Sequence, residues 1–456
     1  MNQVVKKAGY LIAMISMPAI LWAQQPSKNL SLSEAIELGL GHSKDLMLSD
    51  AAVQQAEASL QESKDAKLPE LNLSGAYLYL TKPHLDLNFN QDNDKDDADG
   101  DDNSGSSMPD VNQAVYGILN ASLPLYAGGK IQNSIKSAYY LKEATKLDAE
   151  NQKEAVVQNI ISSYYNLYKA DAALKLVKEN LRTAEQRVKD FSNLEANGII
   201  PRNDLMKAEL QQSNMELAVL DAENNRRITN FNFNLLLGLE DSTTILIDTA
   251  AAAHTALPVE GLSELVEMAH SNRFDYLATI QRSQAAMYNT KAVQGNKYPS
   301  LALTGGYVAA YIPKALTAYN VVNVGLGLKY NIGALYKNKA KERAAETQER
   351  ILDIKKQRLD DDIQTEIFQA YNNYTHQLKK LDVLQKAIEQ AAENYRITKN
   401  KYDNSLATAT DLFDADVAQL QARINMANAK ADAAVAYNKI YETVGVLNKR
   451  VAKLAK

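Results

Sequence analysis

The sequence predicts a mainly α-helical protein with a smaller β part, in which long coiled-coil helices alternate with pairs of strands. Three observations predict this fold class: an internal repeat, apolar residues spaced alternately three and four apart, and short segments in which apolar and polar residues alternate. The chain has 456 residues and a formal net charge of -5. This acidic balance argues against a nucleic-acid partner, which requires a basic surface.

The N-terminal segment 1–23 has the features of a signal peptide. Lys6 and Lys7 precede the mostly apolar stretch Tyr10–Leu21, and Ala23 offers a small residue for cleavage. The apolar stretch is too short to cross a membrane as a helix. The chain contains no cysteine, which excludes disulfides, thiol catalysis, cysteine-bound metals and a lipid anchor on a processed N-terminal cysteine.

The internal repeat is visible as motifs that return at a constant separation. Pro69 returns as Pro299, 230 residues later, whereas Asp204 returns as Asp411, 207 residues later. The difference arises because the acidic segment 92–102 occurs only in the first copy. The sequence therefore predicts a first structural repeat at 29–248, a linker at 249–258, a second repeat at 259–447 and a C-terminal tail at 448–456.

Within each repeat, the predicted order is helix, strand, strand, long helix and shorter helix. The three-four spacing places a narrow apolar seam along one side of each helix, as in a coiled coil. The stretch from Gly129 to about Leu194 has no proline and no internal glycine, which corresponds to a helix of roughly 100 Å. Helices at 33–67 and 203–237 would each span about 50 Å. This predicts a tube wall in which long helices lie beside stacked pairs of shorter ones.

The clearest candidate strand runs from Val322 to Ile332, with apolar residues at every second position. This alternation fits an apolar face toward lipid and a polar face toward a lumen, so Asn323, Lys329 and Asn331 are predicted to face the lumen. A small soluble sheet with one wet face would alternate in the same way, but the signal peptide and the long helices favour a membrane sheet. Four strands cannot enclose a lumen, so closure of a barrel would require several copies.

Two motifs mark the junctions between helices and strands. The first is Lys67-Leu68-Pro69-Glu70-Leu71-Asn72-Leu73, and the second is Leu123-Pro124-Leu125-Tyr126-Ala127-Gly128-Gly129-Lys130, with a looser copy at Asn331-Ile332-Gly333. These junctions and the duplicated order of elements resemble the TolC-like outer-membrane efflux proteins, or outer membrane factors. The resemblance covers nearly all of the mature chain.

This resemblance implies a homotrimer in which four strands per protomer complete a twelve-stranded β-barrel above a long coiled-coil α-helical barrel. It implies residence in the lipid of the outer membrane with a large periplasmic portion. It also implies docking to a periplasmic adaptor (a membrane fusion protein) and an inner-membrane pump. The expected function is that of a passive exit duct in a tripartite efflux or type I secretion system.

Both repeats interrupt their long helix at matching places, which we expect to be helical hairpin tips. Gly198 can adopt a positive φ and Pro201 can open the next helix. The resemblance implies that Gly198, Pro201, Asp204 and Ser405 contact the adaptor. A plain turn in the chain explains the same residues, and both interpretations can hold together.

A candidate periplasmic entrance follows from the same resemblance. Tyr402 matches a family position that holds the entrance shut, although Ala407 stands where the accompanying arginine is common. Asp411 and Asp414 lie three residues apart on one helix face, where three copies would form acidic rings that favour cations. The alternative is that these are ordinary acids in a first helical turn, which stabilise the helix N-terminus.

The remaining motifs predict no cofactor, no metal site and no enzymatic activity. In the acidic segment 92–102, alignment of Gly100 with the turn glycine of an EF-hand puts Lys95 at the first ligand position and Ser106 at the last. We expect a solvated extracellular loop there instead. The alternative function is a periplasmic coiled-coil adaptor or structural protein without a barrel. The exported substrate, the class of pump and the resting state of the entrance stay open.

Overall fold

The computed structural model describes residues 27–81, 112–247, 258–313 and 316–454. The predicted signal peptide, the acidic segment 92–102 and nearly all of the predicted linker lie outside these residues. Within them, no helix is both long enough and apolar enough to cross a membrane.

The same order of elements occurs twice along the chain, which confirms the predicted duplication. The first copy comprises α2 Leu32–His42, α3 Lys44–Asp65, β2 Glu70–Tyr79, β3 Gln113–Ala127, α4 Lys130–Ala196 and α5 Arg202–Leu237. The second comprises α6 Leu262–Asn272, α7 Phe274–Gln294, β5 Ser300–Ile312, β6 Leu316–Lys329, α8 Ala334–Asp403 and α9 Ala409–Thr443. Four short elements complete the described chain: β1 Ser27–Leu30, β4 Thr244–Ile247, the 3-10 helix η2 Gly295–Lys297 and α10 Leu447–Leu454. The long helices α4 and α8 have 67 and 70 residues.

The chain forms two compact units, to which both long helices contribute residues. We call residues 49–149 and 274–361 the sheet unit, because they contain β2, β3, β5 and β6. We call the remainder the hairpin unit, because it contains the turns from α4 to α5 and from α8 to α9.

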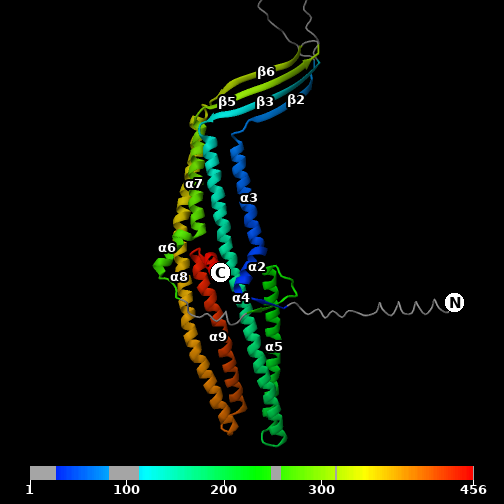
Figure 1. Cartoon of the computed structure of the whole chain (residues 1–456), viewed down its shortest axis with the longest axis vertical. Coiled ribbons are helices and arrows are strands. Elements are labelled where there is room, and N and C mark those ends of the chain that lie inside the picture. Colours follow the sequence, from blue (N-terminus) through cyan, green and yellow to red (C-terminus); the bar gives the residue numbers. More distant parts are fainter. Residues whose placement is uncertain (1–26, 82–111, 248–257, 314–315, 455–456) are drawn as a thin grey trace, which may run out of the picture. The chain divides into compact units, whose positions relative to one another are not determined.

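The sheet unit holds a four-stranded antiparallel sheet in the order β2-β3-β5-β6 (Figure 1). The pairing aligns Leu73, Leu119, Tyr307 and Val322 in one row across all four strands. The adjacent row consists of Asn72, Asn120, Gly306 and Asn323. Because successive residues of a strand point to opposite sides, the apolar row and the polar row lie on opposite faces of the sheet.

The apolar row is exposed, with 81% of Leu73 and 69% of Val322 accessible to solvent. The predicted strand is present as β6, with its apolar residues on one side, but it ends at Lys329, earlier than the predicted Ile332. Asn331 lies beyond the strand, where its carbonyl accepts a hydrogen bond from the amide of Ala334 at 2.9 Å. Lys329 and Asn323 share the polar side of β6.

The single helix predicted at 33–67 is wrong, because the chain leaves the helical conformation at Ser43. Ser43 has ψ 116°, and its hydroxyl accepts a hydrogen bond from the amide of Leu46 at 3.3 Å, which starts α3. The second copy breaks at Arg273, which has ψ 117°. There Arg273 forms an ion pair of 2.6 Å with Glu366 and donates to the carbonyl of Thr443 at 3.3 Å.

The hairpin unit contains a two-stranded parallel sheet that the sequence did not predict. In it, β1 pairs with β4 along four residues. The side chain of Asn230 on α5 holds β4, because it donates to the carbonyl of Thr243 at 2.8 Å and accepts from the amide of Ile245 at 2.9 Å. Leu30 and Ile245 are fully buried beside this sheet.

Most of the segment predicted as a C-terminal tail belongs to α10. The side-chain oxygens of Glu154 on α4 accept the amide hydrogen of Asn448 at 3.1 and 3.2 Å, which satisfies a backbone donor at the start of α10. Glu154 is 3% exposed, and burial raises its pKa to about 7.

Candidate functional site

The hairpin unit has two turns, one between α4 and α5 and one between α8 and α9 (Figure 1), and both have the same backbone construction. In the α4–α5 turn, Gly198 has φ 70°, and the amide of Ile199 donates to the carbonyl of Leu194 at 2.9 Å. In the α8–α9 turn, Ser405 has φ 62°, and the amide of Leu406 donates to the carbonyl of Lys401 at 2.7 Å. A left-handed residue followed by this hydrogen bond is a common way to end a helix. Ser405 therefore adopts a conformation that glycine adopts more easily.

The helices that leave the two turns begin differently. Pro201 precedes α5 and provides no side-chain cap. Thr408 precedes α9 and forms a capping box with Asp411, whose carboxylate accepts from the Thr408 amide at 2.9 Å and from its hydroxyl at 2.7 Å. The hydroxyl and amide of Thr408 lower the pKa of Asp411. Asp411 thus stabilises the N-terminus of α9, which is the alternative to an acidic ring that the sequence analysis left open.

The other two predicted carboxylates at the tips are placed differently. Asp204 lies in the first turn of α5 and forms an ion pair with Lys207 at 3.3 Å. Asp414 lies one turn further along α9 than Asp411 and is exposed. Of the two acids predicted to line an entrance, Asp414 is therefore the one whose carboxylate stands outside the cap of α9.

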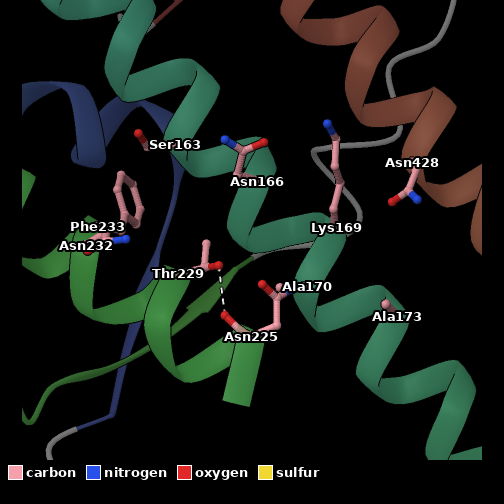
Figure 2. Close-up of a pocket in the computed structure, with 10 residues that line it drawn as sticks. All are labelled: Ser163, Asn166, Lys169, Ala170, Ala173, Asn225, Thr229, Asn232, Phe233 and Asn428. Carbon is pink, nitrogen blue, oxygen red and sulfur yellow. Dashed lines mark hydrogen bonds between the residues drawn. The ribbon is translucent and has the colours of Figure 1, made fainter. Parts of the chain in front are cut away.

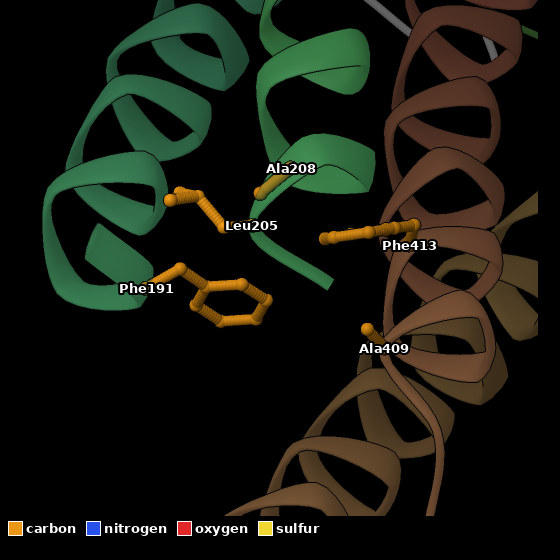
Figure 3. Packing of buried hydrophobic residues seen from close by; sticks show 5 residues of the cluster. All are labelled: Phe191, Leu205, Ala208, Ala409 and Phe413. Carbon is orange, nitrogen blue, oxygen red and sulfur yellow. The ribbon is translucent and has the colours of Figure 1, made fainter. Parts of the chain in front are cut away.

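An apolar cluster packs the two hairpins together behind their turns (Figure 3). Its buried members come from α4, α5 and α9, and they are Phe191, Leu205, Ala208, Ala409 and Phe413. Tyr402 of α8 packs against this cluster, with its ring stacked on Phe191 at a centroid distance of 5.5 Å and an interplanar angle of 13°. The Tyr402 hydroxyl is buried without a hydrogen-bond partner among the described residues, and burial raises its pKa.

Next to the cluster lies a buried polar network that the sequence did not predict. Arg187 on α4 and Asp416 on α9 form an ion pair of 2.9 Å. Arg187 also donates to the hydroxyl of Tyr395 on α8 at 3.2 Å, and Asn180 donates to Asp416 at 3.3 Å. One sequence feature could have indicated this network: Asp416 lies three residues after Phe413, in the apolar seam of α9.

The structure therefore gathers some predicted residues and separates others. Tyr402 joins the cluster between the hairpins, while Gly198, Pro201 and Ser405 are exposed at the turns. The strand residues Asn323 and Lys329 belong to the sheet unit.

A polar cavity of about 480 Å³ lies in the hairpin unit farther from the two turns, between α4, α5 and α9 (Figure 2). Its lining includes the amides Asn166, Asn225 and Asn428. The one lysine in the lining, Lys169, forms an ion pair with Asp432. In the part of the chain that the structure describes, no three histidine or acidic side chains are grouped to hold a metal.

Comparison with known proteins gives a consistent result. The sequence profile of the outer membrane efflux protein family matches residues 35–239 and 265–446. No curated protein sequence matches the chain. Among solved structures, the outer membrane channel CmeC of Campylobacter jejuni is 18% identical with a TM-score of 0.71, over 93% of this chain and 89% of that one.

Two other solved structures have the same fold. The outer membrane protein VceC of Vibrio cholerae is 17% identical with a TM-score of 0.71, over 91% of this chain and 96% of that one. The outer membrane channel MtrE of Neisseria gonorrhoeae, solved in an open state, is 18% identical with a TM-score of 0.70, over 91% of this chain and 88% of that one.

Proposed function

Because the chain belongs to the outer membrane efflux protein family, we propose that it is a passive exit duct of a tripartite efflux or type I secretion system. Family membership places it in the outer membrane, with a large helical portion in the periplasm. As a duct it catalyses no reaction, and the inner-membrane pump with which it works supplies the energy.

One observation carries this proposal: the sheet has two unlike faces. The exposed row that contains Leu73 and Val322 lies beside the row that contains Asn72 and Asn323. Contact with lipid removes the apolar row from water, while the polar row, with Asn323 and Lys329, lines an aqueous lumen.

The order of the strands supports assembly into a homotrimer. The outer strands β2 and β6 each have a partner on one side only within the described sheet. Unpaired backbone groups are very unfavourable in lipid, so these edges must pair with other copies. Three copies of four strands give a twelve-stranded barrel, wide enough for a lumen.

The hairpin tips are the part of the duct that we assign to the periplasmic adaptor. Gly198, Pro201 and Ser405 are exposed there, and Asp204 lies in the first turn beyond. At the same end, Asp414 supplies an acidic ring at the entrance, whereas Asp411 caps α9. Tyr402 contributes to closure through its stacking on Phe191.

The proposal is tested with the full chain expressed in a Gram-negative host. We expect it to remain with the outer membrane after washing in high salt, to migrate as a heat-sensitive trimer, and to form channels in planar bilayers. Protein that is released by salt, runs as a monomer and forms no channels would contradict the proposal. It would favour the alternative function, a periplasmic coiled-coil adaptor or structural protein without a barrel.

The entrance is tested by block of the same channels with divalent cations. Asp414→Asn should weaken the block because it removes three charges from the assembled ring. Asp382→Asn, at an exposed position of α8 outside the turn, is the control. Equal block in the two variants would remove Asp414 from the entrance.

A further inference from the structure

A cavity of about 550 Å³ lies in the sheet unit where the strands meet the long helices. Its walls come from the ends of β3 and β6, the start of β5, the 3-10 helix η2 and the first turns of α4 and α8. Its volume lies within the range of small-molecule sites. Asn338, which is 4% exposed, and Tyr298 are among the lining residues.

Four lysines line this cavity, and no acidic residue does. They are Lys130 of α4, Lys329 of β6, and Lys337 and Lys341 of α8. Among the described residues, none of the four forms an ion pair with a carboxylate. The cavity therefore concentrates positive charge in a hollow of the surface, where an anion is attracted more strongly than at a flat surface.

The acidic residue next to the cavity, Glu342, already has partners. Glu342 forms an ion pair of 2.5 Å with Lys297 and accepts a hydrogen bond of 2.6 Å from Asn338. These contacts lower the pKa of Glu342, with Lys297 as the main cause. Glu342 thus neutralises Lys297, which does not line the cavity, and leaves the four lysines uncompensated.

The two helices that start at the cavity also lack the acids found elsewhere in the chain. Helices α2, α3, α5, α6, α7 and α9 each carry an acidic residue in their first turn. Helices α4, α8 and α10 carry none, and α8 instead has Lys337, Lys339, Lys341 and Arg343 near its start. A helix N-terminus favours negative charge, so basic residues at both starts oppose the usual preference. An external anion at this place would balance the charge of the four lysines and suit the positive ends of both helix dipoles.

Close backbone packing fixes the shape of the cavity. Gly128 has φ 62°, and a Cβ atom there would overlap the carbonyl oxygen of Gly295. A Cβ atom on Gly295, which lines the cavity, would lie 2.8 Å from the carbonyl oxygen of Gly128. Glycine at both positions lets the start of α4 lie directly against η2, so the cavity has a rigid backbone wall.

We propose that this cavity binds a phosphate-type oxyanion through Lys130, Lys329, Lys337 and Lys341. Ammonium groups act as point charges toward phosphate and need no fixed bidentate geometry. In this respect the cavity resembles the basic pockets that bind lipid headgroups at membrane surfaces.

The oxyanion can be either the headgroup of a phospholipid or dissolved phosphate, and both possibilities rest on the proposed function. In an outer-membrane channel, the strand ends beside the helices lie at the periplasmic membrane surface, where phospholipid headgroups are found. Lys329 also shares the polar, lumen-facing side of β6 with Asn323, where dissolved phosphate would pass.

The test uses the purified full-length protein and two probes. Inorganic phosphate is titrated calorimetrically at low ionic strength, and retention of phosphatidylglycerol is measured by native mass spectrometry. The variant Lys337→Gln/Lys341→Gln should weaken binding on the order of tenfold. Lys337→Arg/Lys341→Arg should retain it, and so should the control Lys379→Gln/Lys386→Gln on the same helix.

The outcomes separate the sources as well as the hypotheses. A loss restricted to phosphate identifies a dissolved anion, and a loss restricted to phosphatidylglycerol identifies a lipid headgroup. Equal binding of both probes by the wild type, the glutamine variant and the control overturns the proposal. If the double variant does not assemble, Lys329→Gln, which changes a strand end, gives the same comparison. Channels that conduct but bind neither probe would overturn this proposal alone, whereas phosphate binding without channels would overturn only the proposed function.

Discussion

The guanidinium of Arg187 and the carboxylate of Asp416 form an ion pair of 2.9 Å in which both side chains are less than a tenth exposed. The pair connects α4 with α9, and the hydroxyl of Tyr395 on α8 accepts a further hydrogen bond from Arg187 at 3.2 Å. The two helical hairpins are thus joined by a charged contact behind their turns as well as by the apolar cluster around Phe191.

Removal of one partner of this pair should be strongly destabilising. Asp416→Ala leaves the Arg187 guanidinium buried without its carboxylate, so we expect a loss of about 3–5 kcal/mol in the free energy of unfolding. Asp403→Ala removes an exposed pair with Lys399 and should cost at most about 0.5 kcal/mol. Denaturant unfolding followed by circular dichroism measures both. Similar losses in the two variants would contradict the assigned burial.

The two hairpin turns should respond in opposite directions to exchange of their left-handed residues. Ser405→Gly relieves an unfavourable backbone conformation at φ 62° and should raise stability by about 0.5–1 kcal/mol. Gly198→Ala introduces the same strain at φ 70° and should lower it by about 1 kcal/mol. Thermal unfolding of the two variants tests the pair. The same sign in both would show that side-chain contacts, rather than backbone conformation, control these turns.

The pKa of Glu154, raised by burial from 4.5 to about 7, predicts a dependence of stability on pH. Between these pH values the folded protein holds a proton that the unfolded chain has released, so its free energy of unfolding falls as the pH rises. Glu154→Gln removes this titration and keeps an oxygen that can accept from the amide of Asn448. We expect the variant to match the wild type near pH 5 and to exceed it near pH 8, by at most about 3 kcal/mol. Denaturant unfolding at both pH values measures the difference in free energy of unfolding between the variant and the wild type. The same difference at both pH values would contradict the prediction.

The contact between Gly128 and Gly295 should tolerate no side chain. Gly128→Ala adds a Cβ atom against a backbone carbonyl at a position with φ 62°, so we expect a loss of at least about 2 kcal/mol. Gly117→Ala, inside β3, adds a Cβ atom with no other atom within 4 Å and should change stability by less than about 0.5 kcal/mol. Thermal unfolding compares the two. Equal effects would indicate that the start of α4 can move away from η2.

The repeating parts of the fold were predictable from the sequence because they have a regular period. The absence of proline and internal glycine predicted the long helix at 129–194 within two residues, and the period-two alternation predicted a strand in the region of β6. The turns were found from Gly198, Pro201 and the matching Ser405. In each case the signal is a residue type or spacing that determines the local backbone.

The features that were not predicted depend on contacts between distant residues. Four-residue strands such as β1 and β4 show no usable alternation, and their partners are far apart in the chain. The pairing of Arg187 with Asp416 joins helices from different repeats. The cavity with four lysines likewise combines residues from both repeats. Only the tertiary fold brings such residues together. The break at Ser43 is the exception, because it rests on the local hydrogen bond from the amide of Leu46 to the Ser43 hydroxyl.

The parallel pairing of β1 with β4 has a consequence for biogenesis. Ser27 pairs with Thr244, so β1 can find its partner only after more than 200 further residues have been synthesised. Until then this strand has open edges, a state that favours misassembly with other nascent chains. The first described strand therefore becomes fixed only when the first copy of the repeat is nearly complete.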